Sequence, residues 1–242
     1  TVSMASYFKN QCGARYAREF AVASTSLANS QSLYDTLIQY NMIFFRGGDQ
    51  WEYYNLFRNT LLLQAVKDIF ASGGVVGGTS AGLHILSKVV YTARNGTVYP
   101  YECIENPNNQ YVTLEDDFLD FFPGWVFDSH MAERGRFARL PGFMAHWKLN
   151  KGEEISGLGL DDLTCMFVDN NGLGTVYGTG AANIYLPLGD YRLNPSKLLA
   201  DSVRVIQLLQ GSTFDFETYA VTHQGLPLSL PLPPAYETSG YT

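Results

Sequence analysis

The sequence predicts an α/β protein, organised as a three-layer α/β/α sandwich around a mostly parallel sheet. In the first half, short apolar runs that end in glycine alternate with helical patterns. This alternation is typical of parallel strands joined by right-handed crossovers, with helices on both faces of the sheet. The second half is richer in short strand patterns separated by Gly and Asn turns, so we expect a strand-rich C-terminal half.

The individual elements follow from the spacing of apolar residues. Helices are expected over about 7–16, 33–40 and 51–70, with strands at 42–45, 75–77 and 125–127. Strands 42–45 and 75–77 are apolar and bounded by glycines, which is typical of interior strands buried on both faces. Later strand patterns cover 157–160, 165–168, 175–177, 184–186 and 203–209. We expect one domain over 1–224 and an extended, proline-containing tail over 225–242.

Composition excludes several classes of protein. The net charge of -7 argues against a general nucleic-acid binder, and no apolar run approaches the roughly 20 residues of a membrane span. Charged residues are 16% of the chain, below the usual figure of about 25%. Cys12, Cys103 and Cys165 are widely spaced without a CxxC pair, so they predict neither a metal site nor a disulfide framework. Low lysine content is compatible with a secreted or periplasmic protein.

The segment from Val75 to Leu86 contains the most informative motif. A short strand runs into Gly78-Thr79-Ser80-Ala81-Gly82, a G-x-S-x-G pattern, and then into a possible helix. Strand, tight turn and helix are the context of a nucleophile elbow, in which Ser80 would be exposed and the amide of Ala81 would face an oxyanion. The alternative is a chance Gly/Ser turn.

A nucleophilic serine needs a base, and the chain has 4 histidines. His84 is expected to pack beneath the elbow and His146 to pack on a helix. His130, after the strand ending at Phe127, is the favoured base, although it could instead cap the next helix. Asp161 and Asp162 follow another strand and supply a carboxylate to orient the imidazole. The chain order Ser, His, Asp excludes the α/β-hydrolase fold.

Three arginines follow His130 closely. If this segment is helical, Arg134 shares a face with His130, and Arg136 and Arg139 are neighbours. They could form an ordinary solvated face. They could also bind a substrate carboxylate, because the guanidinium group suits planar, bidentate recognition.

Four separated motifs resemble the cyanophycinase family of serine peptidases, peptidase family S51, over roughly residues 5 to 190. The motifs are Gly47-Gly48-Asp49-Gln50, Gly78-Thr79-Ser80-Ala81-Gly82, Asp128-x-His130-x-x-x-Arg134-x-Arg136-x-x-Arg139-Leu140 and Gly157-Leu158-Gly159-Leu160-Asp161-Asp162-x-Thr164. The resemblance implies a flavodoxin-like fold related to class I glutamine amidotransferases. It also implies a serine hydrolase that cleaves peptide or isopeptide bonds at aspartyl residues, of the β-Asp-Arg type, through an acyl-enzyme.

The resemblance also assigns roles to residues. Ser80 is the nucleophile, His130 the base and Asp162 the acid, while Asp161 stays open as an alternative acid. Gln50, Asp128, Arg134, Arg136 and Arg139 match substrate-binding positions. The oxyanion hole would combine the amide of Ala81 with one from the turn Gly48-Asp49. No metal or organic cofactor is needed.

This sequence departs from the family in three ways. Ser129 stands where the family has Gln, and Asp162 stands where it has Glu. The strands that open the family's sheet are also absent before Tyr7, so we expect further N-terminal sequence, on a separate chain or segment, to complete the sheet. A second copy of this chain, forming a homodimer, is the other partner to consider.

The substrate expected is an aspartyl-containing or cyanophycin-like peptide. An α-aspartyl dipeptidase or an esterase on the same fold is the closest alternative. A non-catalytic peptide- or carbohydrate-binding relative is the alternative from another class.

Overall fold

The computed structural model describes residues 3–224, which form a mixed α/β protein. The first elements are α1 (Met4–Asn10), α2 (Thr25–Ala28), α3 (Gln31–Leu37), β1 (Met42–Phe45), α4 (Gln50–Phe57), α5 (Leu61–Ala71), β2 (Val75–Gly78) and α6 (Ala81–His84). The middle of the chain forms β3 (Val90–Tyr91), α7 (Pro100–Glu105), β4 (Leu114–Glu115), β5 (Trp125–Ser129), α8 (Arg139–Lys151) and β6 (Ser156–Leu160).

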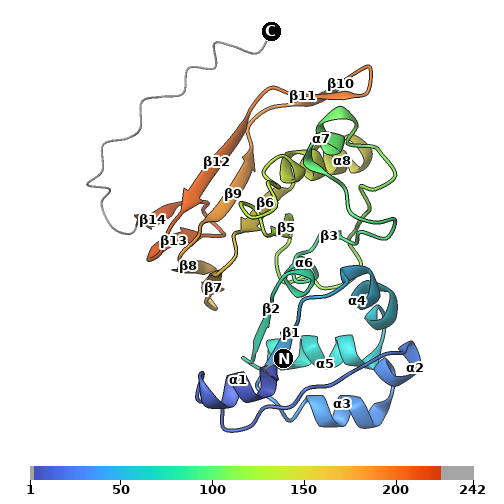
Figure 1. Cartoon of the computed structure of the whole chain (residues 1–242), viewed down its shortest axis with the longest axis vertical. Coiled ribbons are helices and arrows are strands. Elements are labelled where there is room, and N and C mark those ends of the chain that lie inside the picture. Colours follow the sequence, from blue (N-terminus) through green and yellow to red (C-terminus); the bar gives the residue numbers. More distant parts are fainter. Residues whose placement is uncertain (1–2, 225–242) are drawn as a thin grey trace.

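The strand-rich C-terminal half agrees with expectation. It contains β7 (Thr164–Val168), β8 (Leu173–Gly178), β9 (Ala182–Pro187), β10 (Tyr191–Asn194), β11 (Lys197–Ala200), β12 (Val203–Leu208), β13 (Ser212–Asp215) and β14 (Val221–Gln224). In Figure 1 helices α1–α5 gather with β1 and β2 at one end, and the sheets of the second half lie at the other. The tail expected over 225–242 lies outside the described residues.

The sheet pairing is only partly parallel. Strands β1 and β2 pair in parallel, as do β5 and β6, whose sheet has the order β12-β9-β6-β5. The other pairings among the described strands are antiparallel, including those of the separate sheet β14-β13-β8-β7. Short turns such as 170–172 join these later strands, and short turns can join only antiparallel neighbours. Residues 3–224 therefore do not form the mostly parallel sheet that the sequence predicts.

Strands β1 and β2 are less buried than their apolar sequences predict. Met42 and Val75, which lie opposite each other at the start of the strands, are 41% and 45% exposed. Phe45, at the end of β1, is 6% exposed and belongs to the main core. The expectation of burial on both faces along the whole strand was wrong: the first residue of each strand is exposed, Ile43 and Val76 are partly buried against the core, and only Phe45 is fully buried.

The helix expected over 51–70 is divided in two. Arg58 leaves the helical conformation with a ψ of 132° and ends α4, and Asn59 follows with a left-handed φ of 58°. Thr60 then takes an extended conformation and starts α5. The first helix is also shorter than expected, since α1 ends at Asn10 and not near Tyr16. The apolar periodicity continues across the break between α4 and α5 because both of these helices bury apolar residues in the same core.

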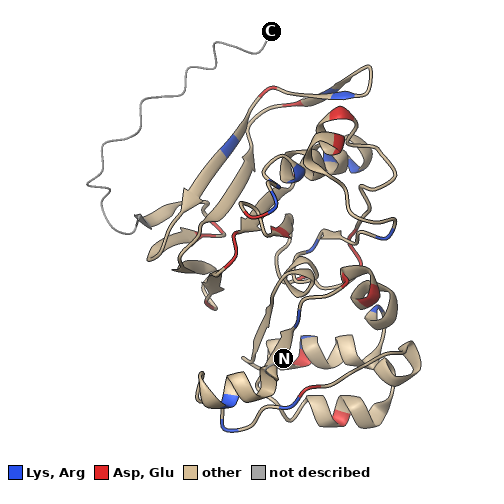
Figure 2. Cartoon of the chain, in the orientation of Figure 1, with Lys and Arg blue, Asp and Glu red and all other residues tan. Residues whose placement is uncertain are grey.

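Helix α6 lies between the two ends of the molecule and packs against β1, β2, α4 and β5. Acidic and basic residues are spread over both ends, as Figure 2 shows. None of the helices between residues 3 and 224 is both long and apolar enough to cross a lipid bilayer.

Close backbone contacts require glycine on both sides of Ser80. A Cβ at Gly82 would lie 2.2 Å from the carbonyl oxygen of Phe45 in β1. A Cβ at Gly78 would lie 2.1 Å from the carbonyl oxygen of Gly82 itself. Both contacts involve backbone atoms, which cannot rotate away as a side chain could.

Gly82→Ala should therefore destabilise the protein by about 1–3 kcal/mol, the usual cost of overpacking a core. Gly77→Ala is the matched control, because its Cβ would meet only the Phe44 side chain, at 3.3 Å. Urea unfolding of the two variants measures the difference. Equal stability of the two variants would contradict the close approach of α6 to β1.

Candidate active site

Ser80 lies in a strained turn between β2 and α6. Its backbone has φ 54° and ψ -120°, a conformation that is rare for residues other than glycine. His130 has a similar φ of 55°. Strained residues of this kind occur preferentially at functional sites.

A hydrogen-bonded series links Ser80, His130 and Asp162. The Nε2 atom of His130 lies 2.8 Å from the Oγ atom of Ser80. Its Nδ1 atom is hydrogen-bonded to Oδ1 of Asp162. His130 directly follows β5 and Asp162 comes shortly after β6. Because β5 and β6 are parallel neighbours, their carboxyl ends meet and bring the two side chains together.

Asp161 has a different environment from Asp162. Its Oδ1 accepts a hydrogen bond from the amide of Ala132, 3.1 Å away, and its Oδ2 accepts one from the amide of Ala181, 2.9 Å away. Asp161 thus ties the turn after β5 to the start of β9. The carboxylate that meets His130 is that of Asp162.

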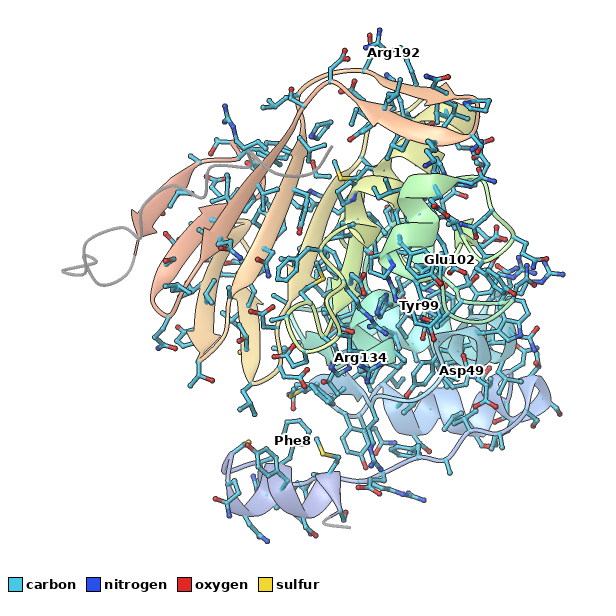
Figure 3. All side chains as sticks on the ribbon, turned by 45° about the horizontal axis from the view of Figure 1, so that its top comes forward. Phe8, Asp49, Tyr99, Glu102, Arg134 and Arg192 are labelled. Atoms are coloured by element: carbon cyan, nitrogen blue, oxygen red, sulfur yellow. The ribbon has the colours of Figure 1, made fainter. Side chains whose placement is uncertain are left out.

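The turn Gly47-Gly48 lies against the elbow. A Cβ at Gly47 would be 3.2 Å from the Cβ atom of Ser80. Asp49 follows this turn and caps α4, its Oδ1 accepting a hydrogen bond from the amide of Trp51 at 2.8 Å. Figure 3 labels Asp49 and also Arg134, which comes from the turn after β5.

A cavity of about 160 Å³ opens beside Ser80. It is lined by Gly48, Gln50, Ser80, Ala81, His84, Ala93, Thr97, Arg134, Arg136 and Arg139. Most of the residues singled out in the sequence therefore converge on one cavity. Over residues 3–224, no group of three or more His, Cys, Asp or Glu side chains is arranged to hold a metal ion.

The segment after His130 is not helical, which corrects the expectation. Residues 131–138 form turns, and α8 begins only at Arg139. The left-handed conformations of His130 and Gly135, with φ of 55° and 58°, prevent a continuous helix. The turns nevertheless bring Arg134 and Arg136 to the cavity.

The three arginines differ in burial and in their partners. Arg134 is exposed, and among the described residues its side chain has no ion-pair partner. Arg136 is half-buried and donates a hydrogen bond to the carbonyl oxygen of Ser129, 3.0 Å away. Arg139 is 1% exposed, and its guanidinium carbon lies 4.8 Å from the centre of the Tyr91 ring.

Asp128 is fully buried and joins these groups. Its Oδ2 lies 3.0 Å from Nε of Arg139, and its Oδ1 lies 3.7 Å from a terminal nitrogen of Arg136. Burial, together with the neighbouring charge of Arg139, lowers the pKa of Arg136 to about 10. One carboxylate thus faces two guanidinium groups, which leaves the cavity wall with an excess of positive charge.

His84 was expected only to pack beneath the elbow, and its place in the cavity wall was missed. It is 2% exposed, and its Nε2 lies 3.2 Å from Oγ of Ser129. The sequence did contain a signal for this position: His84 comes four residues after Ser80, and residues at this spacing lie on the same face of a helix. Ala93 and Thr97 were missed too, since they come from a loop without a motif. His146 lies elsewhere, with Nδ1 2.9 Å from the carbonyl oxygen of Pro107.

Comparisons with known proteins find similar sequences and a similar solved structure. No protein-family model matches the chain. Cyanophycinases from Synechococcus elongatus and Thermosynechococcus vestitus are each 26% identical over 220 residues, which is 88% of this chain and 64% of theirs. The chain therefore spans less than two thirds of the length of these relatives.

A solved structure shares the fold. The crystal structure of a peptidase from an acI-B1 Actinobacterium has a TM-score of 0.55 and 16% sequence identity. The match covers 82% of this chain and 73% of that one. Together the comparisons confirm the resemblance that the four motifs predict: the chain is cyanophycinase-like.

Proposed function

We propose that this chain is a serine-type peptidase that hydrolyses peptide or isopeptide bonds at aspartyl residues. The observation that carries the proposal is the hydrogen-bonded series Ser80, His130 and Asp162 at the mouth of an arginine-lined cavity. The names of the similar proteins, cyanophycinase and peptidase, support the same reaction class.

In the proposed reaction, His130 Nε2 accepts the proton of Ser80 as Oγ attacks the substrate carbonyl carbon. The new oxyanion accepts hydrogen bonds from the amide of Ala81 and from an amide of the Gly48-Asp49 turn. His130 then gives the proton to the leaving amine, and the carbon–nitrogen bond breaks. In the second half, His130 takes a proton from water as the water oxygen attacks the acyl carbon. His130 then returns this proton to Oγ of Ser80 as the ester bond breaks, which releases the acid and regenerates Ser80.

The cavity indicates what the substrate carries next to the reacting bond. Its wall contains Arg134 and Arg136, together with Gln50 at the start of α4. A carboxylate entering the cavity would offset the excess positive charge and could bind a guanidinium in two places. In an aspartyl residue only two carbons separate the free carboxylate from the amide carbonyl. We therefore propose cyanophycin-like or aspartyl peptides as the substrates.

The domain organisation and the relation to a flavodoxin-like core are also part of our proposal. We take residues 1–224 as one catalytic domain, because α6 contacts elements from both ends of the molecule. The parallel pairs β1–β2 and β5–β6 would be the parts of this domain that correspond to a flavodoxin-like core.

Ser80→Ala should reduce turnover of an aspartyl peptide by about 10³-fold or more, because the nucleophile is removed. Ser72→Ala is the control, since the Ser72 hydroxyl bonds only the carbonyl oxygen of Ile69, away from the cavity. The assay is release of the amine product with both variants equally folded. Retention of most of the turnover by Ser80→Ala would refute the nucleophile.

Asp162→Asn should lower kcat by about 10²–10⁴-fold, because the His130 imidazole loses the group that orients it and stabilises its charged form. Asp161→Asn should instead lower stability by about 1–3 kcal/mol, because one of its two backbone N–H partners loses its acceptor. Steady-state kinetics and urea unfolding of both variants separate the two roles. A larger loss of kcat in Asp161→Asn would reverse the assignment.

Arg134→Lys should lower kcat/KM by about tenfold or more without changing the melting temperature, because an exposed guanidinium loses its planar fork. Arg139→Lys should lower the melting temperature, because the buried guanidinium pairs with Asp128 and stacks on Tyr91. Kinetics with an aspartyl peptide and thermal unfolding test both. Unchanged kinetics in Arg134→Lys would place this residue in an ordinary solvated turn.

A further inference from the structure

The two turns that carry His130 and Asp162 exchange hydrogen bonds with each other. His130 stands at the start of the turn after β5, and Asp162 lies in the turn after β6. The amide of Ala132, in the first turn, donates a hydrogen bond to Oδ1 of Asp161 in the second, at 3.1 Å. In the opposite direction, the amide of Asp162 donates to Oε1 of Glu133, at 3.0 Å. Each turn therefore gives one N–H group and one carboxylate to the other.

Glu133 takes no part in the proposed reaction, although its carboxylate contacts the residue that orients His130. Its side chain is exposed, and among the residues that the structure describes it forms no ion pair. The hydrogen bond to the amide of Asp162 lies near solvent, where a single bond adds little to the stability of the fold. Because the donor is a backbone N–H group, this bond instead fixes where the backbone of Asp162 lies relative to the turn after β5.

The position of this backbone decides whether the Asp162 carboxylate reaches the imidazole. An aspartate has a single methylene group between Cα and the carboxylate, so a shift of its backbone moves the carboxylate with it. The side chain of Asp162 is 45% exposed, so packing alone does not hold it in place. Leu163, the next residue, has a φ of 53°, an unfavourable conformation that surrounding contacts have to maintain. Those contacts include Glu133 on the amide of Asp162 and the hydroxyl of Thr164, which donates to the Asp162 carbonyl oxygen at 3.1 Å.

We propose that Glu133 is a positioning residue, whose carboxylate holds the amide of Asp162 and thereby keeps the Asp162 carboxylate on Nδ1 of His130. The inference rests on the proposed function and deepens it, because Glu133 acts through the series Ser80, His130 and Asp162. Asp161 ties the same two turns together, but its side chain contacts the amides of other residues. Glu133 contacts the backbone of Asp162 itself.

Substitutions of Glu133 separate its hydrogen bond from its charge. Glu133→Ala removes the acceptor, so kcat for the dipeptide β-Asp-Arg should fall by about 10–10²-fold with KM nearly unchanged, the effect of a small misplacement among catalytic groups. Glu133→Gln keeps an acceptor oxygen and loses only the charge, so it should recover most of this loss. Glu102→Ala is the matched control, because Glu102 also accepts a hydrogen bond from a backbone amide, that of Tyr99 at 2.7 Å, but does not line the cavity. A wild-type kcat in Glu133→Ala, or equal losses in Glu133→Ala and Glu133→Gln, would overturn the inference.

A double-mutant cycle measures whether Glu133 acts through Asp162. In the Asp162→Asn background, Glu133→Ala should cause no further loss of kcat, because the carboxylate that Glu133 positions is already absent. A residue that only stabilised the fold, or that contacted the substrate itself, would lower kcat by the same factor in both backgrounds. Equal factors in the two backgrounds, with thermal unfolding showing that all variants are folded, would contradict the positioning role.

The proton between His130 Nδ1 and Asp162 provides a readout without turnover. A proton shared by an imidazole and a carboxylate gives a far-downfield proton NMR signal, and the signal that is missing in Asp162→Asn identifies it. This signal should persist in Glu133→Gln and be lost in Glu133→Ala. That result supports the inference even if β-Asp-Arg is not hydrolysed, in which case only the proposed peptidase reaction fails. An unchanged signal in Glu133→Ala, together with wild-type hydrolysis, would refute the role of Glu133 and leave the peptidase proposal standing.

Discussion

The buried carboxylate of Asp128 is the interaction on which the rest of the cavity depends. It lies on β5 and meets His84 from α6, Arg136 from the turn after the strand, and Arg139 at the start of α8. Removing one partner of a buried ion pair typically costs about 3–5 kcal/mol, because the remaining charge is left without compensation. Asp128 thus fixes the positive wall of the cavity relative to β5, the strand that also positions His130.

The fold could be predicted where local backbone chemistry decides it. The strand at 42–45, the elbow around Ser80 and the strands of the second half follow from apolar runs bounded by glycine and turn residues. Pairing direction and burial could not be predicted in the same way, because they depend on contacts between distant segments. The exposure of Met42 and Val75 is an example, because the apolar sequence of a strand does not determine whether other segments cover its first residue.

The site shows the same division. Ser80, His130 and Asp162 could be proposed from sequence because each comes shortly after a strand, although β2 pairs with β1 while β5 and β6 belong to another sheet. The contrast between Asp161 and Asp162 could not, because it depends on the amides of Ala132 and Ala181. The sequence predicts a helix after His130 where the structure has turns, because the left-handed conformations of His130 and Gly135 do not affect the pattern of apolar residues.

Covalent labelling tests directly whether Ser80 is the activated nucleophile that we propose. The folded protein is treated with a serine-directed fluorophosphonate and digested with trypsin, and the peptide between Lys67 and Lys88 is sequenced by mass spectrometry. This peptide also contains Ser72 and Ser87, which serve as internal controls. We expect a single adduct, on Ser80, that does not form in denatured protein. No adduct, or an adduct on another serine, would contradict it.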